Sequence, residues 1–297
     1  MTQIRKKFSI IVAVLFIFNL SITTLTGTSS NTVKAAATQA KGCTTIHSNW
    51  MEEKLTYQKV GTLYFANDGQ KICVKKAGQK AKILVSTKDY FSNVLTNGTK
   101  IYYQLENKVY SIDTNGKNKK KVCTWKHDYK KTLSGIYEDI LYYSYRYGDL
   151  DCDQHTYTYN MKTKKTAKLF SNLVVGEQKD SYMTVVGMAN DVSPVALKLY
   201  NLKTKKLTSL CKEQSGAAFV GNKVYFAKYI SYNAKTDKSK FAIKYYDIAN
   251  GKTVTVKTID GVISVNQFTE KGCYYFGNDC TTKFYNYKTK KTTVIKR

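Results

Sequence analysis

The chain has 297 residues, and its 48 Lys and Arg against 21 Asp and Glu give it a formal net charge of +27. With 42% hydrophobic and 13% aromatic residues it can bury a large core, which excludes a disordered tail and a disulfide-held miniprotein. One Pro and 17 Gly exclude a collagen-like or linker-dominated chain. The composition predicts a globular protein with a basic surface.

The first 37 residues have the pattern of a secretory signal peptide. Basic residues at 5–7 precede a 13-residue apolar run from Phe8 to Leu20, and small residues follow up to Ala37. The run is shorter than the roughly 18 to 20 apolar residues that cross a membrane, so an uncleaved anchor is the weaker interpretation. We expect cleavage after Ala37, a mature protein outside the cytoplasmic membrane, and no later membrane span.

The remaining chain keeps 44 basic and 21 acidic residues, a net charge of +23. In the whole sequence the arginines are Arg5, Arg146 and Arg297. Nucleic-acid readers favour arginine because its planar fork grips phosphate and guanine edges in two places, so we expect no nucleic-acid partner. Anionic polymers or lipid head groups of a bacterial envelope fit the charge better. A lysine-rich surface that serves only solubility stays an open alternative.

After an N-terminal segment at 38–53, short apolar and aromatic runs recur about every forty residues over 54–297. The central tyrosines of these runs are 38, 40, 40, 43 and 49 residues apart. They are Tyr64, Tyr102, Tyr142, Tyr182, Tyr225 and Tyr274. Each run is followed by a second strand-like run and a Lys-rich turn. The spacing predicts six structural repeats.

Each repeat reads as four short strands, which the second repeat illustrates. Strands are expected at 92–96, 100–105, 108–113 and 119–124, and Asn-Gly pairs between them favour tight hairpins. The second strand is apolar at consecutive positions, so neighbouring sheets must cover both its faces, and the lysines of the fourth strand suit an exposed edge.

The pattern predicts an all-β fold, a six-bladed β-propeller with four-stranded antiparallel blades. We expect it to begin near Lys54 and to close without exchanging a strand. Residues 38–53 would add an edge strand or a cap.

The second repeat also carries a family resemblance. Tyr102-Tyr103 and the stretch Val109–Lys117 resemble six-bladed propellers of secreted Gram-positive proteins, which are similar to the low-density-lipoprotein-receptor (YWTD-type) and TolB-like propellers. The Asp…Asn-Gly-Lys turn of this motif recurs in the fifth repeat. The resemblance implies a binding or scaffold role in a Gram-positive bacterium, at the cell surface or outside it.

One short stretch has the spacing of a cation site. Asp149, Asp151 and Asp153 place three carboxylates at alternate positions, as in loops that wrap Ca²⁺ in oxygen ligands. Gln154 stands where Gly would make the sharp turn, and Asn160 stands where a bidentate Glu would close the site. A solvated hairpin is therefore the stronger interpretation. Ca²⁺ is the one cofactor that the sequence suggests.

The seven cysteines include no Cys-x-x-Cys pair, so zinc-site spacing is absent. Cys273 and Cys280 flank a turn in the last repeat and are the candidates for a disulfide. The alternative is that the cysteines are small buried apolar residues, their more usual state. The three histidines lie in separate segments and are expected to be surface or packing residues.

Aromatic and polar residues in and beside the connections between repeats form the preferred ligand surface. They are Trp50, Tyr90, Trp125, His127, Asp128 and Tyr129. Flat rings at this face could stack on a sugar or hold a peptide side chain, although core packing between blades is an alternative for each. On the opposite face, the turns between third and fourth strands carry 20 lysines, which would attract polyanions weakly and in a salt-dependent way.

Three functions from different classes follow. The leading hypothesis is a secreted, non-catalytic propeller that binds an envelope protein, peptide or glycan. The second is a lysine-rich wall-associated protein held electrostatically by an anionic wall polymer. The third is an enzyme, a lyase or hydrolase that uses loop residues of the axial face, which is the face that carries the connections between repeats. No Gly-x-Ser-x-Gly turn or phosphate loop supports an enzyme.

Overall fold

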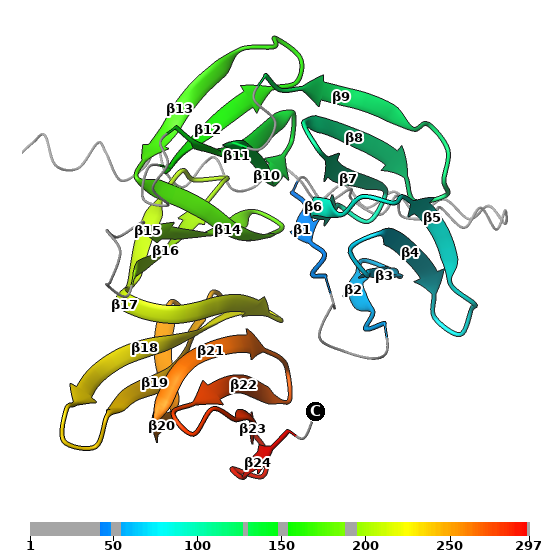
Figure 1. The fold of residues 1–297 in the computed structure, drawn as a ribbon. Coiled ribbons are helices and arrows are strands. Elements are labelled where there is room, and N and C mark those ends of the chain that lie inside the picture. The colour runs from blue at the N-terminus through cyan, green and yellow to red at the C-terminus, as the bar shows by residue number, and fades with distance from the viewer. Residues whose placement is uncertain (1–41, 49–54, 127–129, 148–153, 188–194, 296–297) are drawn as a thin grey trace, which may run out of the picture. The chain divides into compact units, whose positions relative to one another are not determined.

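The computed structural model describes residues 42–48, 55–126, 130–147, 154–187 and 195–295. Within these ranges the regular elements are β-strands and there is no α-helix (Figure 1). The predicted all-β class is therefore confirmed. No helix that could cross a membrane occurs in the part of the chain described.

Three of the sheets are separate and have four strands each, paired antiparallel in chain order. The first contains β2 (Gln58–Val60), β3 (Leu63–Asn67), β4 (Lys71–Lys76) and β5 (Lys82–Ser86). The second contains β10 (Lys131–Tyr137), β11 (Ile140–Arg146), β12 (Gln154–Asn160) and β13 (Thr166–Ser171). The third contains β21 (Val262–Phe268), β22 (Gly272–Gly277), β23 (Thr282–Asn286) and β24 (Thr292–Val294).

The fourth sheet has 12 strands, in which three antiparallel sets are linked. The first set is β6 (Phe91–Thr96), β7 (Lys100–Leu105), β8 (Lys108–Asp113) and β9 (Lys120–Thr124). The second is β14 (Leu173–Lys179), β15 (Tyr182–Gly187), β16 (Val195–Asn201) and the long β17 (Leu207–Val220). The third reuses β17 and adds β18 (Lys223–Asn233), β19 (Lys238–Asp247) and β20 (Lys252–Asp260). A two-residue strand, β1 (Thr44–Thr45), joins the first set to the second.

The strands predicted for the second repeat agree with β6 to β9 within one residue at each end. A two-residue turn, Glu106-Asn107, joins β7 to β8, and Glu106 adopts a positive φ of 51° in it. The last strands are edges, as their lysines predict, in every set except the second, whose last strand β17 also pairs with β18. All three residues of β24 are exposed, and β9 and β20 end the 12-stranded sheet.

Five apolar clusters fill the spaces between consecutive sets of strands. The first joins the β2–β5 sheet to β6–β9, and another joins β18 and β19 to the sheet of β21–β24. The second strands contribute side chains that are 0% exposed, namely Phe65, Ile101, Leu141, Met183, Val224 and Cys273. β7, β11, β15 and β18 have an apolar cluster on each face, which explains their consecutive apolar residues.

Residues 42–48, here called the inserted segment, lie among the first strands of the sets. β1 pairs antiparallel with β6 on one side and with β14 on the other (Figure 1). The expectation that residues 38–53 form an edge strand or cap is wrong for this segment, because Thr44 has partners on both sides. An edge strand would leave one row of backbone groups unpaired.

Candidate functional site

The inserted segment contacts four different strands within seven residues. Gly42 bridges to Tyr137 of β10, and the Cys43 N–H donates to the Ile136 carbonyl at 3.0 Å. The Ile46 N–H donates to the Val94 carbonyl at 2.8 Å, and Ser48 bridges to β3. The segment thus satisfies backbone groups that the first strands would otherwise leave unpaired, which is costly in a buried position.

Side chains of neighbouring sets satisfy further groups along β10. Gln104 accepts the Leu133 N–H at 2.7 Å and donates to the Lys131 carbonyl at 2.9 Å. On the other side, Gln178 accepts the Ile136 N–H at 2.6 Å and donates to the Ile136 carbonyl at 2.7 Å. These glutamines are 2% and 1% exposed. Their buried amides are explained by backbone pairing, so they need no catalytic role.

A histidine and a carboxylate meet at the end of the inserted segment. His47 Nδ1 lies 3.7 Å from Glu177 Oε1, and Glu177 Oε2 accepts the Phe219 N–H at 3.0 Å. Burial raises the pKa of Glu177, although His47 and the Phe219 N–H oppose the shift. His47 was expected to be a surface or packing residue; its side chain is 43% exposed and that of Glu177 is 20% exposed. The pair offers one acid-base couple that sequence reasoning did not identify.

Two of the predicted ligand residues lie in the described ranges. Tyr90 is 72% exposed and lies against Gly69, whose φ is +92°. Trp125 is 7% exposed and packs on Tyr143, with ring centroids 5.3 Å apart, inside an apolar cluster. Trp125 therefore occupies the core position named as its alternative. The remaining four fall outside the described residues: Trp50, His127, Asp128 and Tyr129.

The predicted Ca²⁺ ligands Asp149, Asp151 and Asp153 also fall outside the described residues. Across the described ranges, no group of three or more His, Cys, Asp or Glu could hold a metal ion. Cys273 is buried and Cys280 is exposed, and both are free thiols in the structure. Their disulfide stays a prediction.

Strands β11 and β12 and the residue after β11 carry a row of aromatic side chains, here called the aromatic strip: Tyr143, Tyr145, Tyr147, His155 and Tyr157. Tyr145 pairs with His155 and Tyr143 with Tyr157 in the antiparallel register, which places their side chains on one face of the sheet. The rings of Tyr147 and His155 are 4.4 Å apart, and those of Tyr145 and Tyr157 are 6.0 Å apart.

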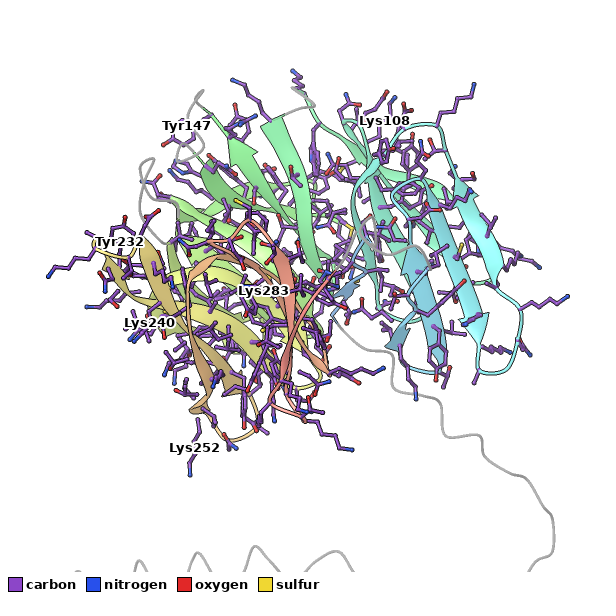
Figure 2. The ribbon with its side chains drawn as sticks, turned by 60° about the horizontal axis from the view of Figure 1, so that its bottom comes forward. Lys108, Tyr147, Tyr232, Lys240, Lys252 and Lys283 are labelled. Atoms are coloured by element: carbon purple, nitrogen blue, oxygen red, sulfur yellow. The ribbon has the colours of Figure 1, made fainter. Side chains whose placement is uncertain are left out.

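The strip begins in the core and ends at the surface. Tyr143 at its inner end is 5% exposed. Tyr147 at its outer end, labelled in Figure 2, is 45% exposed. The Lys131 ammonium lies 5.2 Å from the Tyr145 ring centroid, within reach of a cation–π interaction. The alternation of aromatics at 143, 145 and 147 with those at 155, 157 and 159 is a signal in the sequence that could have identified this face.

Three Lys-rich turns between third and fourth strands share one sequence, Asn-x-Lys-Thr-Lys-Lys, at 160–165, 201–206 and 286–291. In each turn the Asn side chain accepts two backbone N–H groups at 2.9 to 3.0 Å. The fifth residue then adopts a positive φ: 61° at Lys164, 60° at Lys205 and 60° at Lys290. Gly251 holds the corresponding place in another turn, with φ of 69°. Left-handed backbone disfavours lysine and suits glycine.

A surface hollow with a volume of about 420 Å³ is lined by residues that include Lys223, Asp247 and Glu270. It is open and mixes both charges. None of the residues predicted as ligand or metal sites lines it.

Solved structures resemble this fold at low sequence identity. An oligogalacturonate lyase in complex with manganese aligns with a TM-score of 0.52 at 12% identity, over 86% of this chain and 78% of that chain. TolB from Acinetobacter baumannii aligns with a TM-score of 0.45 at 8% identity, over 86% of this chain and 63% of that chain. No family model matches the sequence, and neither does any curated protein.

The likeness to the lyase, together with the antiparallel four-stranded sheets, supports the predicted β-propeller and repeat architecture. At 12% identity it says nothing about activity, and the manganese belongs to the lyase complex. The number of blades, the resemblance to YWTD-type propellers and secretion stay predictions.

Proposed function

We propose that the chain is a secreted, non-catalytic six-bladed β-propeller that binds a ligand of the bacterial cell envelope. In this proposal residues 1–37 are a signal peptide, and the four-stranded sets β2–β5, β6–β9, β10–β13, β14–β17, β17–β20 and β21–β24 are the blades. The ligand is a carbohydrate, peptide or protein, and the chemistry of the aromatic strip favours a carbohydrate.

The observation that carries this proposal is the graded exposure of the aromatic strip. A tyrosine ring offers a flat apolar face with a polar hydroxyl at its edge, which suits a sugar ring that has an apolar face and a rim of hydroxyls. Tyr147 and His155 already pack on each other, with ring centroids 4.4 Å apart, and His155 Nδ1 accepts the Asn172 N–H at 3.2 Å, so both lose less side-chain freedom on binding than unrestrained rings would. Lys131 adds a positive charge beside the strip.

A pair of variants tests the strip. Tyr147→Ala with His155→Ala removes its exposed end, and Tyr232→Ala removes a tyrosine of β18 that is 53% exposed and lies outside the strip (Figure 2). Binding of soluble peptidoglycan fragments, measured by calorimetry at low and high salt, should weaken at least about tenfold in the double variant, since losing one stacked ring costs about 1.4 kcal/mol or more. Equal weakening by Tyr232→Ala would contradict a specific site.

The Lys-rich turns favour a second candidate, a wall-associated protein held by an anionic polymer. A lysine in the left-handed region costs about 1 kcal/mol relative to a residue that accepts this backbone, and the chain carries it three times. Strained residues that persist often serve function. A positive charge at the tip of each turn is a feature that Gly or Asn could not supply.

Matched triple variants separate charge from strain. Lys164→Asn, Lys205→Asn and Lys290→Asn together remove three charges and relieve the left-handed positions, so the free energy of unfolding should rise by about 1 to 2 kcal/mol. Changing the exposed strand residues Lys59, Lys228 and Lys257 to Asn removes the same charge but should not raise the free energy of unfolding. Binding to inorganic polyphosphate should fall more in the turn variant. Equal losses would assign the attraction to overall charge.

The third hypothesis, a lyase or hydrolase, has one supporting feature in the described residues, the contact of His47 with Glu177. A catalytic site would need further groups that converge on the same substrate atoms. The enzymatic hypothesis therefore stays a prediction of lower rank.

A further inference from the structure

The strand position between β6 and β14 has the properties of a peptide-binding site. β6 and β14 are the first strands of their sets, and β1 connects them in the 12-stranded sheet. Thr44 pairs with Thr96 on one side and with Lys179 on the other. Adding a strand to exposed edges is a known mode of peptide recognition, in which backbone hydrogen bonds supply affinity and side-chain pockets supply specificity.

The side chains of the inserted segment fit separate places in the fold. Cys43 is 1% exposed in the cluster of β6–β9 with β10–β13, and Ile46 is 3% exposed in the cluster of β2–β5 with β6–β9. The Thr45 hydroxyl, 8% exposed as a residue, accepts the Gln178 N–H at 2.9 Å. Residues 43–46 therefore place two side chains in apolar pockets and make one side-chain hydrogen bond to the backbone.

Gly42 sets a size limit at the start of this site. A Cβ atom at residue 42 would collide with the backbone carbonyl of Asp180. Backbone atoms yield less readily than the end of a flexible side chain, so a larger residue at this position must displace the segment or the β14–β15 turn. The site thus selects a strand of the pattern Gly-Cys-Thr-Thr-Ile, with small residues first and an aliphatic residue at the fifth position.

We propose that the position between β6 and β14 is a binding site for an extended peptide strand, whose resident ligand is the chain's own inserted segment and which accepts the same sequence in trans. This goes beyond the proposed function, because that function uses the aromatic strip and does not need the site. Nine residues, 49–57, join the segment to β2 of the first sheet, so its effective concentration at the site is on the order of millimolar. A separate peptide must reach that concentration to compete.

The first test uses the full chain with Gly42→Glu and Ile46→Asp, which blocks the size-limited position and buries a charge in an apolar pocket. A fluorescent peptide with the sequence of residues 39–48 should bind this variant saturably and raise its melting temperature by several degrees. The same peptide with both substitutions should not bind. A variant that keeps its β-sheet circular dichroism but binds no peptide would overturn the proposal.

A second measurement on the unmodified chain covers the case in which the variant does not fold. Cys43 is buried by the segment's own insertion, so displacement of the segment exposes its thiol to an alkylating reagent. A peptide of residues 39–48 with Cys43→Ser, supplied at about millimolar concentration, should accelerate labelling of Cys43 severalfold, because it then matches the effective concentration of the tethered segment. A scrambled peptide should have no effect. An unchanged labelling rate would show that the segment is a fixed structural strand.

Discussion

Gln178→Leu is the substitution that most directly tests how the first strands are held together. The Gln178 amide accepts the Ile136 N–H at 2.6 Å and donates to the carbonyls of Ile136 and Asp180 at 2.7 and 2.8 Å. Leucine has a similar volume but makes none of these bonds. The buried Ile136 N–H would lose its partner, at a cost of about 1 to 3 kcal/mol, and each of the other two bonds contributes about 1 kcal/mol. The expected loss is about 3 to 5 kcal/mol.

The assay is chemical denaturation followed by circular dichroism, with the melting temperature as a second measure. For a domain of this size, 1 kcal/mol corresponds to about 2 to 4 °C, so the melting temperature should fall by roughly 10 °C. Gln104→Leu, which removes the matching contacts with Leu133 and Lys131, should cost a similar amount. Gln79→Leu, at an exposed turn, is the control and should change stability by less than about 0.5 kcal/mol. A loss below about 1 kcal/mol for Gln178→Leu would refute the argument.

Two further predictions concern titratable groups. Burial raises the pKa of Glu177 above its ordinary value of 4.5, so between 4.5 and the raised pKa the folded state binds more protons than the unfolded state and stability falls as pH rises. Glu177→Gln should remove this slope and be more stable than the unmodified chain at pH 7; parallel stability curves from pH 4 to 8 would contradict it. Burial raises the pKa of Cys273 to about 12, so native alkylation at about pH 8 should modify the exposed Cys280 and spare Cys273. If Cys280 reacts only after reduction, the predicted disulfide has formed.

The repeat architecture was predictable because it leaves a periodic signal. Apolar pairs such as Tyr102-Tyr103 mark second strands wherever sheets stack on both faces, and Asn-Gly turns mark the hairpins between them. Within each four-stranded set every strand pairs with its sequence neighbour, so the local pattern contains most of the information that these sets need. That is why the predicted limits of β6 to β9 agree with the structure within one residue.

The inserted segment was not predictable in this way. Its strand is two residues long and pairs with β6 and β14, whose paired residues lie about 50 and 135 residues further along the chain. No hydrophobic period identifies such a strand, and the sequence suggested an edge or cap instead. The burial of Gln104 and Gln178 was not predictable either. A glutamine in a strand resembles a surface residue until the backbone group that it pairs with is known.

The aromatic strip shows a different limit. The tyrosines at 142 and 143 were assigned to the core run of the third repeat, and the structure places both of them in the core at 2% and 5% exposure. The same alternation continues two residues further to Tyr145 and Tyr147, where coverage by the neighbouring sheet ends. Sequence alone cannot locate that boundary, because core and strip share one residue type and one period of two.

The buried polar groups follow from one requirement of a fold built from separate sheets. Every first strand has one edge that its own sheet leaves unpaired, and a buried unpaired edge costs about 1 to 3 kcal/mol for each N–H or carbonyl. This chain satisfies the edge of β10 with Gln104, Gln178 and the Cys43 N–H, which come from three different segments. Buried polar side chains near these edges are therefore explained by strand pairing, whereas a ligand site is better sought where side chains are exposed to solvent, as at the outer end of the aromatic strip.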